Sequence, residues 1–266
     1  MPSGQSSSGK SGWLPSKDIS SILQGWDYEP GTINVRKIIG SNGAPKLQMR
    51  LDLGLLQMET DGRPDGQRPH GCESLLEFHE QRLKEHRERN GTELGFHLTP
   101  AQCQNLREET LMYHNRYLSL FVLGEYAGVT RDTARNLRVL DLCGKYAIDD
   151  HDRLVLEQYR PHIVMMYTRA MAAIEVEHES YAEAMMIVKN GLREIKRFFI
   201  RFDQVDAYRQ ANEVRILKKL AGEIRGHLPP DPVRQLKKDL QRALKDERYE
   251  EAARLRDEIE RLEAKL

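Results

Sequence analysis

Residues 233–266 read VRQLKKDLQRALKDERYEEAARLRDEIERLEAKL and predict two helices that fold back on each other. Apolar residues recur at spacings of three and four on both sides of a polar break, KDER at 245–248. The recurring positions are Val233, Leu236, Leu240 and Ala243 before the break, and Ala252, Leu255, Ile259, Leu262 and Leu266 after it. This spacing gives each helix a narrow apolar seam of the kind found in coiled coils.

The predicted hairpin is too small to enclose a core of its own. Two short helices with one seam each leave part of that seam in water unless something else covers it. The cover is a second copy of the chain, another protein or the rest of this chain. The segment is therefore expected to make contacts and not to perform chemistry.

The second predicted helix also resembles a known family. Arg248 to Ile259, RYEEAARLRDEI, contains paired alanines and an Arg-Asp step, and a helix with Leu236, Leu240 and Leu244 precedes it. This combination is similar to the UVR motif of the bacterial excision-repair subunits UvrB and UvrC. The motif also occurs in Clp-type chaperone ATPases and in the activator of a protein arginine kinase. Family members usually have Phe where this chain has Tyr249.

The resemblance implies a helical hairpin that mediates self-association or docking between proteins, in a bacterial protein. The partner it implies is a second copy, an excision-repair protein or a Clp-type protein. Apolar side chains are expected to supply buried contact, and a charged pair to set the register. The expected partner-binding residues are Leu236, Leu240, Tyr249, Ala252, Leu255, Arg256, Asp257, Ile259 and Leu262. The resemblance covers about an eighth of the chain and implies no catalytic residue.

The charge balance disfavours nucleic acid as a direct ligand. Residues 233–266 contain ten Lys or Arg and nine Asp or Glu, and the whole chain contains 41 of each sign. A nucleic-acid surface is expected to carry a basic excess. Docking to a protein therefore fits the segment better.

The composition predicts a soluble, mainly α-helical protein of the cytoplasm. Charged residues make up 31% of the 266 residues and hydrophobic ones 39%. No apolar run approaches the roughly 20 residues that cross a bilayer, and no apolar signal core opens the chain. Cys72, Cys103 and Cys143 are odd in number and form no CxxC pair, so a reducing compartment is expected.

The N-terminal residues 1–30 are expected to be a disordered tail. Gly4 to Ser11, GQSSSGKS, satisfies the P-loop pattern. A P-loop needs a strand before it and a helix after it, so that backbone N–H groups face the phosphates. Only three residues precede this stretch, and Gly12 and Pro15 would interrupt a helix. No nucleotide site is therefore expected here.

Residues 31–71 predict a small β element of two or three strands followed by a Pro- and Gly-rich loop. Asn42-Gly43 is a strong hairpin signal. Leu47, Met49, Leu51 and Leu53 then alternate with polar residues, which predicts one apolar face. Beyond the loop, His70, Cys72 and His79 are close in sequence but lack the paired spacing of a structural zinc site. They are expected to be surface residues, and no metal or cofactor is expected.

Residues 72–226 predict an α-helical body. Thr99-Pro100 begins a helix, and breaks are predicted at 128–132 and 178–180. The pattern recurs at an offset of fifty residues, which suggests two helix-turn-helix units of tetratricopeptide-like architecture. A plain helical bundle with a chance register explains the same pattern equally well. Residues 227–232, HLPPDP, predict a semi-rigid linker to the C-terminal hairpin.

Two functions remain open at this point. The first is a non-catalytic interaction or adaptor protein, because no G-x-S-x-G, HExxH or paired-carboxylate loop motif is present. The alternative is a DNA-repair or stress-response factor linked to nucleic acid, which would use a basic and aromatic cluster. That cluster consists of Arg193, Lys196, Arg197, Phe198, Phe199, Arg201 and Phe202. The same cluster also suits an ordinary helix end, where cations are favourable.

Overall fold

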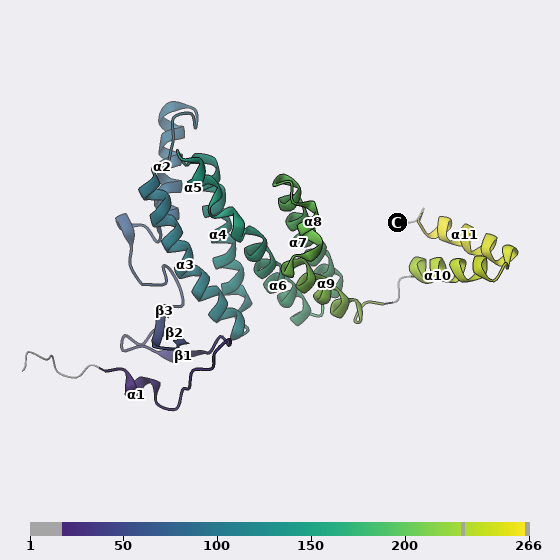
Figure 1. Cartoon of the computed structure of the whole chain (residues 1–266), viewed down its shortest axis with the longest axis horizontal. Helices are drawn as coiled ribbons and strands as arrows, with labels where there is room; N and C mark the ends of the chain where they lie inside the picture. The colour runs from purple at the N-terminus through teal and green to yellow at the C-terminus, as the bar shows by residue number, and fades with distance from the viewer. Residues whose placement is uncertain (1–17, 230–231, 264–266) are drawn as a thin grey trace, which may run out of the picture. The chain divides into compact units, whose positions relative to one another are not determined.

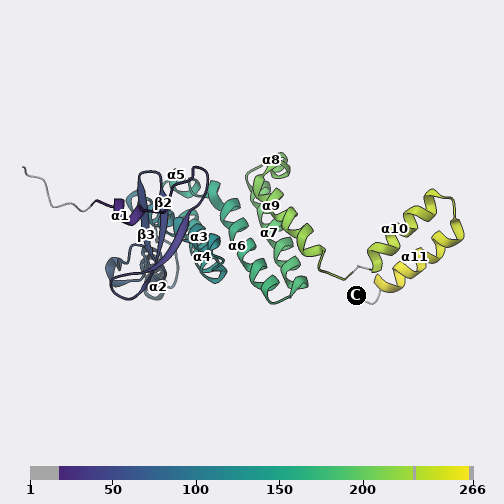
Figure 2. The same ribbon diagram turned by 90° about the horizontal axis from the view of Figure 1, so that it is seen from below.

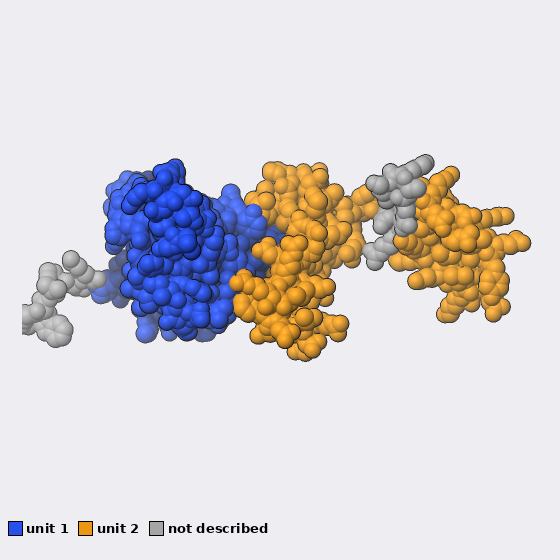
Figure 3. Space-filling model, turned by 90° about the horizontal axis from the view of Figure 1, so that it is seen from above, with its two compact units in different colours: residues 1–170 blue, residues 171–266 orange. Residues whose placement is uncertain are grey.

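The computed structural model describes residues 18–229 and 232–263 of the chain. The described residues are mainly α-helical, with one small antiparallel sheet near the N-terminus, as the sequence predicted. The chain divides into two compact units, residues 1–170 and 171–266 (Figure 3). Among the described helices, none combines the length and the apolar character that crossing a membrane requires. The P-loop-like stretch at 4–11 lies outside the described residues.

The sheet of the first unit has three strands in the order β1-β2-β3, with all neighbours antiparallel. The strands are β1 (Val35–Ile39), β2 (Pro45–Leu51) and β3 (Gly54–Glu59). Gly43 has φ 77°, so the Asn42-Gly43 turn between β1 and β2 uses the left-handed conformation that glycine permits. Leu47 and Met49 are buried as predicted. Leu53 is 94% exposed, because it lies in the tight turn between β2 and β3 and not on a strand.

Part of the predicted disordered tail has defined structure. Residues Ser20–Leu23 form the short helix α1. Trp26 then donates a hydrogen bond from Nε1 to Asn34 Oδ1 at 2.6 Å, and the Arg36 guanidinium lies 4.0 Å from its ring. A cation over an indole and a bonded indole N–H hold this segment on β1. No local sequence pattern indicates these contacts, because they depend on residues of β1 and the segment before it.

The first unit continues with helices that form its main core. They are α2 (Leu75–Asn90), α3 (Pro100–Val122), α4 (Tyr126–Tyr146) and α5 (Asp150–Leu154), with 3-10 turns at Pro69–Gly71 and Glu157–Tyr159. Helices α3 and α4 lie side by side (Figures 1 and 2). The core between them and α2 includes Leu76, Leu98, Leu106, Val139, Leu140 and Ile163.

The start of α3 agrees with the sequence, and the break after it does not. Thr99 caps α3 through a capping box with Gln102. The predicted break at 128–132 was wrong: these residues lie inside α4, and the chain turns at Gly124, which has φ 74°. Gly128 faces α3 instead, where an added Cβ would lie 2.7 Å from Leu120 Cδ1. Gly128 therefore permits α3 and α4 to pack closely, and it does not end a helix.

Helix α6 (Arg160–Glu177) crosses the boundary between the two units. The sequence predicted one long helix from about residue 152, but α5 ends at Leu154, a 3-10 turn follows at Glu157–Tyr159, and α6 begins at Arg160 with Pro161 in its first turn. The break predicted at 178–180 is confirmed, because α6 ends at Glu177 and the next helix begins at Tyr181.

The second unit contains α7 (Tyr181–Arg201), α8 (Val205–Gln210), α9 (Asn212–Arg225), α10 (Pro232–Lys245) and α11 (Tyr249–Glu263). Helices α7 and α9 pack together, and their buried residues include Val188, Ile195, Leu217 and Ile224. One helix was predicted across 206–226, but Ala211 has ψ 130° and separates α8 from α9. The tetratricopeptide-like reading of the body stays a prediction.

Candidate functional site

The C-terminal hairpin consists of α10 and α11, which lie side by side and run antiparallel (Figures 1 and 2). Its turn falls at 246–248, within the polar break predicted from the sequence. Glu247 takes a left-handed backbone conformation with φ 58°, and the N–H of Arg248 donates to the carbonyl of Ala243 at 2.8 Å. The left-handed residue and this hydrogen bond end α10 and reverse the chain direction.

The interior of the hairpin is made by small side chains and one isoleucine. Ala243 is fully buried, and Ala252 and Ile259 are 5% and 6% exposed. Four leucines beside them are only half-buried: Leu236, Leu240, Leu255 and Leu262. The two helices therefore cover only part of their own apolar surface.

Two further apolar residues flank the turn. Leu244 is 50% exposed and Tyr249 is 66% exposed. Together with the four half-buried leucines they form the accessible apolar set of the hairpin: Leu236, Leu240, Leu244, Tyr249, Leu255 and Leu262. Five of the six were expected as partner contacts from the sequence, and Leu244 was not. Ala252 and Ile259, also expected as partner contacts, lie inside the hairpin.

The expected charged pair lies on the surface of α11. Arg256 Nη2 is 2.8 Å from Asp257 Oδ1, and both side chains are more than 60% exposed. The hydrogen bonds that Arg256 donates to the Asp257 carboxylate raise the pKa of Arg256. Exposed pairs of this kind contribute little to stability. Their role in setting the register of a partner stays a prediction.

The hairpin has a counterpart among known protein families. Residues 231–265 match the family model UVR, the UvrB/uvrC motif. We call this segment the UVR hairpin, after the motif that it matches. The match confirms the resemblance seen in the sequence and is confined to this segment. No curated protein and no solved structure gives a significant match to the chain.

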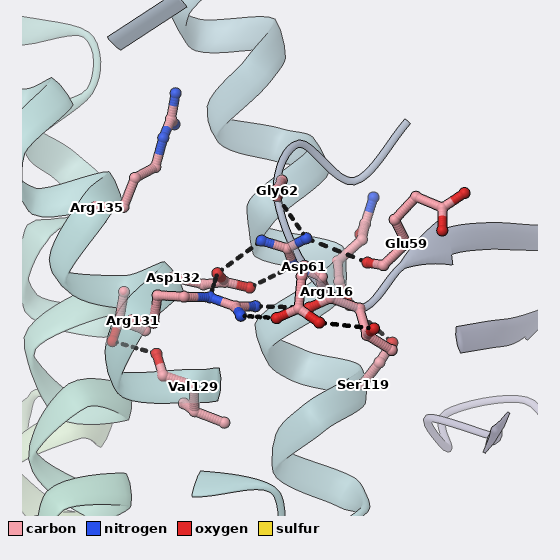
Figure 4. Close-up of polar contacts among 12 residues, drawn as sticks. Glu59, Asp61, Gly62, Arg116, Ser119, Val129, Arg131, Asp132 and Arg135 are labelled. Carbon is pink, nitrogen blue, oxygen red and sulfur yellow. Dashed lines mark hydrogen bonds and ion pairs between the residues drawn. The ribbon is translucent and has the colours of Figure 1, made fainter. Parts of the chain in front are cut away.

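The first unit contains another candidate site, a buried ionic network that was not predicted from the sequence (Figure 4). The carboxylate of Asp132 accepts hydrogen bonds from Arg116 Nε at 2.7 Å, Arg116 Nη2 at 2.8 Å and Arg131 Nε at 2.9 Å. The Arg116 side chain is 1% exposed and Asp132 is fully buried. The remaining Arg116 nitrogen donates to the carbonyls of Glu59 and Gly62 at 3.1 and 2.7 Å. The pair thus fastens the chain after β3 to α3 and α4.

A neighbouring ion pair extends this network to α2. Glu109 is fully buried and accepts hydrogen bonds from Arg135 and from the backbone N–H of Leu75, the latter at 2.9 Å. Both arginines contact the ring of Tyr113, with the guanidinium of Arg135 4.1 Å and that of Arg116 4.8 Å from its centre. Burial raises the pKa of Tyr113 to about 12, so its hydroxyl stays protonated at neutral pH.

A cavity of about 350 Å³ adjoins the network. Four arginines and four carboxylates line it, so its lining has no net charge. The ions also pair with one another, as Arg138 does with Glu80 at 3.4 Å. This arrangement favours a structural role for the network over the capture of a charged ligand.

The sequence does contain a signal for the buried network. Glu109 and Arg116 continue the three- and four-residue spacing of Leu106, Tyr113 and Leu120 on α3. Charged residues at such positions point toward the core, where they need partners. Which residues pair, however, depends on how α3 meets α4, and the spacing does not give that.

Residues 18–229 and 232–263 contain no group of three or more His, Cys, Asp or Glu side chains arranged to hold a metal ion. The expectation that His79 is a surface residue was wrong, because it is 2% exposed. Its Nδ1 accepts a hydrogen bond from Arg82 Nη1 at 3.0 Å, so the ring is neutral. Burial, with the positive charges of Arg82 and His70, lowers the pKa of His79 to about 4.

Acid is expected to destabilise the first unit through His79. Its pKa is about 4 when folded and about 6.5 when unfolded, so between these values only the unfolded chain binds the proton. The free energy of unfolding therefore falls as the pH drops from about 6.5 to 4, by up to about 3 kcal/mol from this residue. Urea unfolding at pH 7 and pH 4.5 measures the loss. In His79→Gln the loss is expected to be smaller. The same loss in the variant as in the wild-type chain would show that His79 is not its source.

The basic and aromatic cluster of α7 is divided between core and surface. Phe199 is 8% exposed and contacts the rings of Phe198 and Tyr208. Arg193, Lys196 and Arg197 are exposed. The aromatic part therefore serves mainly the packing of the second unit, and the cations remain accessible.

Proposed function

We propose that the protein is a non-catalytic adaptor that docks a protein partner, or a second copy of itself, through its UVR hairpin. The observation that carries the proposal is the accessible apolar set on a hairpin that matches the UvrB/uvrC motif. Apolar side chains left half in water favour a partner that covers them.

The charge of the hairpin supports a protein as the partner. Its basic and acidic residues nearly balance, and many of them pair locally, such as Arg248 with Asp246 at 3.2 Å. A polar rim around apolar contacts is the usual make-up of a protein interface. Excision-repair or Clp-type proteins are the partner classes that the motif suggests.

Affinity capture from cell extract tests the adaptor proposal. The baits are the full chain and a chain that ends at Pro232, and both captures are read by mass spectrometry. At least one protein is expected with the full chain and not with the shortened one. Identical captures would place partner binding in residues 1–232 and refute the proposal.

The alternative is a nucleic-acid-linked repair or stress factor, and the exposed Arg193, Lys196 and Arg197 favour it. It predicts salt-sensitive binding of a single-stranded oligonucleotide that survives removal of the hairpin. Titration of both chains with a fluorescent oligonucleotide at two salt concentrations separates the two functions.

A further inference from the structure

A second cavity of the first unit, of about 300 Å³, has a mainly apolar lining. It lies among α3, α4 and the chain from Val155 to Ile163. Its wall includes Leu140 and Ile163, which are buried, and its rim includes Leu111 and Tyr159, which are 59% and 54% exposed. A cavity of this size lies at the lower end of the range for small-molecule sites, about 300–1,000 Å³.

Several polar groups of this cavity already have partners within the protein. Asn136 donates from Nδ2 to the carbonyl of Thr110 at 3.1 Å and accepts from Arg135 Nη1 at 3.0 Å. Arg107 forms an ion pair with Asp152. These pairs leave the lining without an unbalanced charge, which disfavours an ionic ligand.

The imidazole of His114 is a polar group of the cavity lining. Its Nδ1 lies 2.6 Å from the hydroxyl of Tyr117, which is fully buried. Burial raises the pKa of Tyr117, so the phenol stays protonated and can donate a hydrogen bond to Nδ1. Burial, with the neighbouring His162, lowers the pKa of His114 to about 4. At neutral pH the ring is therefore neutral, and in the tautomer that accepts from Tyr117 at Nδ1 it carries its own proton on Nε2.

We propose that this cavity binds an uncharged, mainly apolar small molecule that carries one hydrogen-bond acceptor. Leu111, Leu140, Ile163 and Tyr159 contact its apolar part, and the Nε2–H of His114 donates to its acceptor. The site is separate from the UVR hairpin and does not depend on the docking function. One oriented donor in an apolar cavity distinguishes a carbonyl compound from a hydrocarbon of the same shape.

Acetophenone and cumene are matched probes of this site, because they have the same size and only acetophenone has an acceptor. The measurement is NMR titration of the full chain with labelled methyl groups. Acetophenone is expected to shift the methyl signals of Leu111, Leu140 and Ile163 in a saturable way, and cumene to bind at least about 5-fold more weakly. The absence of saturable shifts with acetophenone would overturn the proposal.

Three variants separate the proposed roles. His114→Phe removes the donor and is expected to weaken acetophenone about 5-fold or more while leaving cumene unchanged. Leu111→Arg places a charge at the rim, on an exposed position that folding tolerates, and should weaken both probes. Leu53→Arg, at an exposed leucine of the β2–β3 turn, is the control and should change the affinity for neither probe.

Equal binding of both probes to the wild-type chain would overturn the donor role. Methyl shifts caused only by an added protein partner would overturn the small-molecule site.

Discussion

Replacing Asp132 by alanine is expected to destabilise the first unit by about 3–5 kcal/mol. The substitution leaves the Arg116 guanidinium buried without the carboxylate that accepts two of its hydrogen bonds at 2.7 and 2.8 Å. It also releases Arg131, which holds Thr60 and Asp61 after β3. Urea unfolding followed by tryptophan fluorescence measures the loss, because Trp26 contacts Asn34 and Arg36 in the first unit.

Two matched variants control this experiment. Asp61→Ala removes the other carboxylate of Arg131, but Asp61 is 83% exposed and its loss should cost less than about 1 kcal/mol. Arg116→Met combined with Asp132→Leu removes both buried charges and should unfold at a higher urea concentration than Asp132→Ala alone. A loss in Asp132→Ala no larger than that in Asp61→Ala would contradict the structural role of the network.

Replacing Leu244 and Tyr249 together by alanine is expected to weaken partner binding about 10- to 100-fold without unfolding the UVR hairpin. Both side chains are at least half exposed, so their loss removes little packing from the hairpin itself. Truncation of a central interface residue costs about 2 kcal/mol or more, and tyrosine is enriched among such residues. Titration of the captured partner onto the variant measures the effect, and circular dichroism confirms the helix content.

The controls for this variant use the two other faces of α11. Arg254 lies two residues after Ala252, about 200° around the helix from the interior, and Arg254→Ala should leave the affinity unchanged. Ile259→Asp places a charge in the interior of the hairpin and should abolish binding together with helix content. Wild-type affinity in the Leu244 and Tyr249 double variant would remove these residues from the docking surface.

The features predicted from the sequence are those that local chemistry determines. The Asn42-Gly43 turn, the Thr99 cap and the 245–248 break of the hairpin each depend on a few neighbouring residues. Gly128 was misread because the local pattern does not tell a helix end from a close helix contact. The structural role of Gly128 depends on Leu120, which lies on another helix.

The candidate sites also differ in whether local sequence or long-range packing determines them. The accessible leucines of the hairpin could be predicted, because a seam in a two-helix element has no other layer to cover it. The Arg116–Asp132 pair and the cavity beside His114 could not, because both depend on where α3 meets α4. The buried state of His79 was missed for the same reason, since it depends on the helices packed against α2.

The most direct test of the docking role is hydrogen–deuterium exchange of the full chain with and without its captured partner. Amide protons of residues 232–263 are expected to exchange more slowly in the complex, because the partner covers the accessible apolar set and stabilises both helices. Residues 18–229 are expected to keep their exchange rates. Slower exchange confined to residues 18–229, with an unchanged hairpin, would contradict the central claim that the UVR hairpin is the docking module.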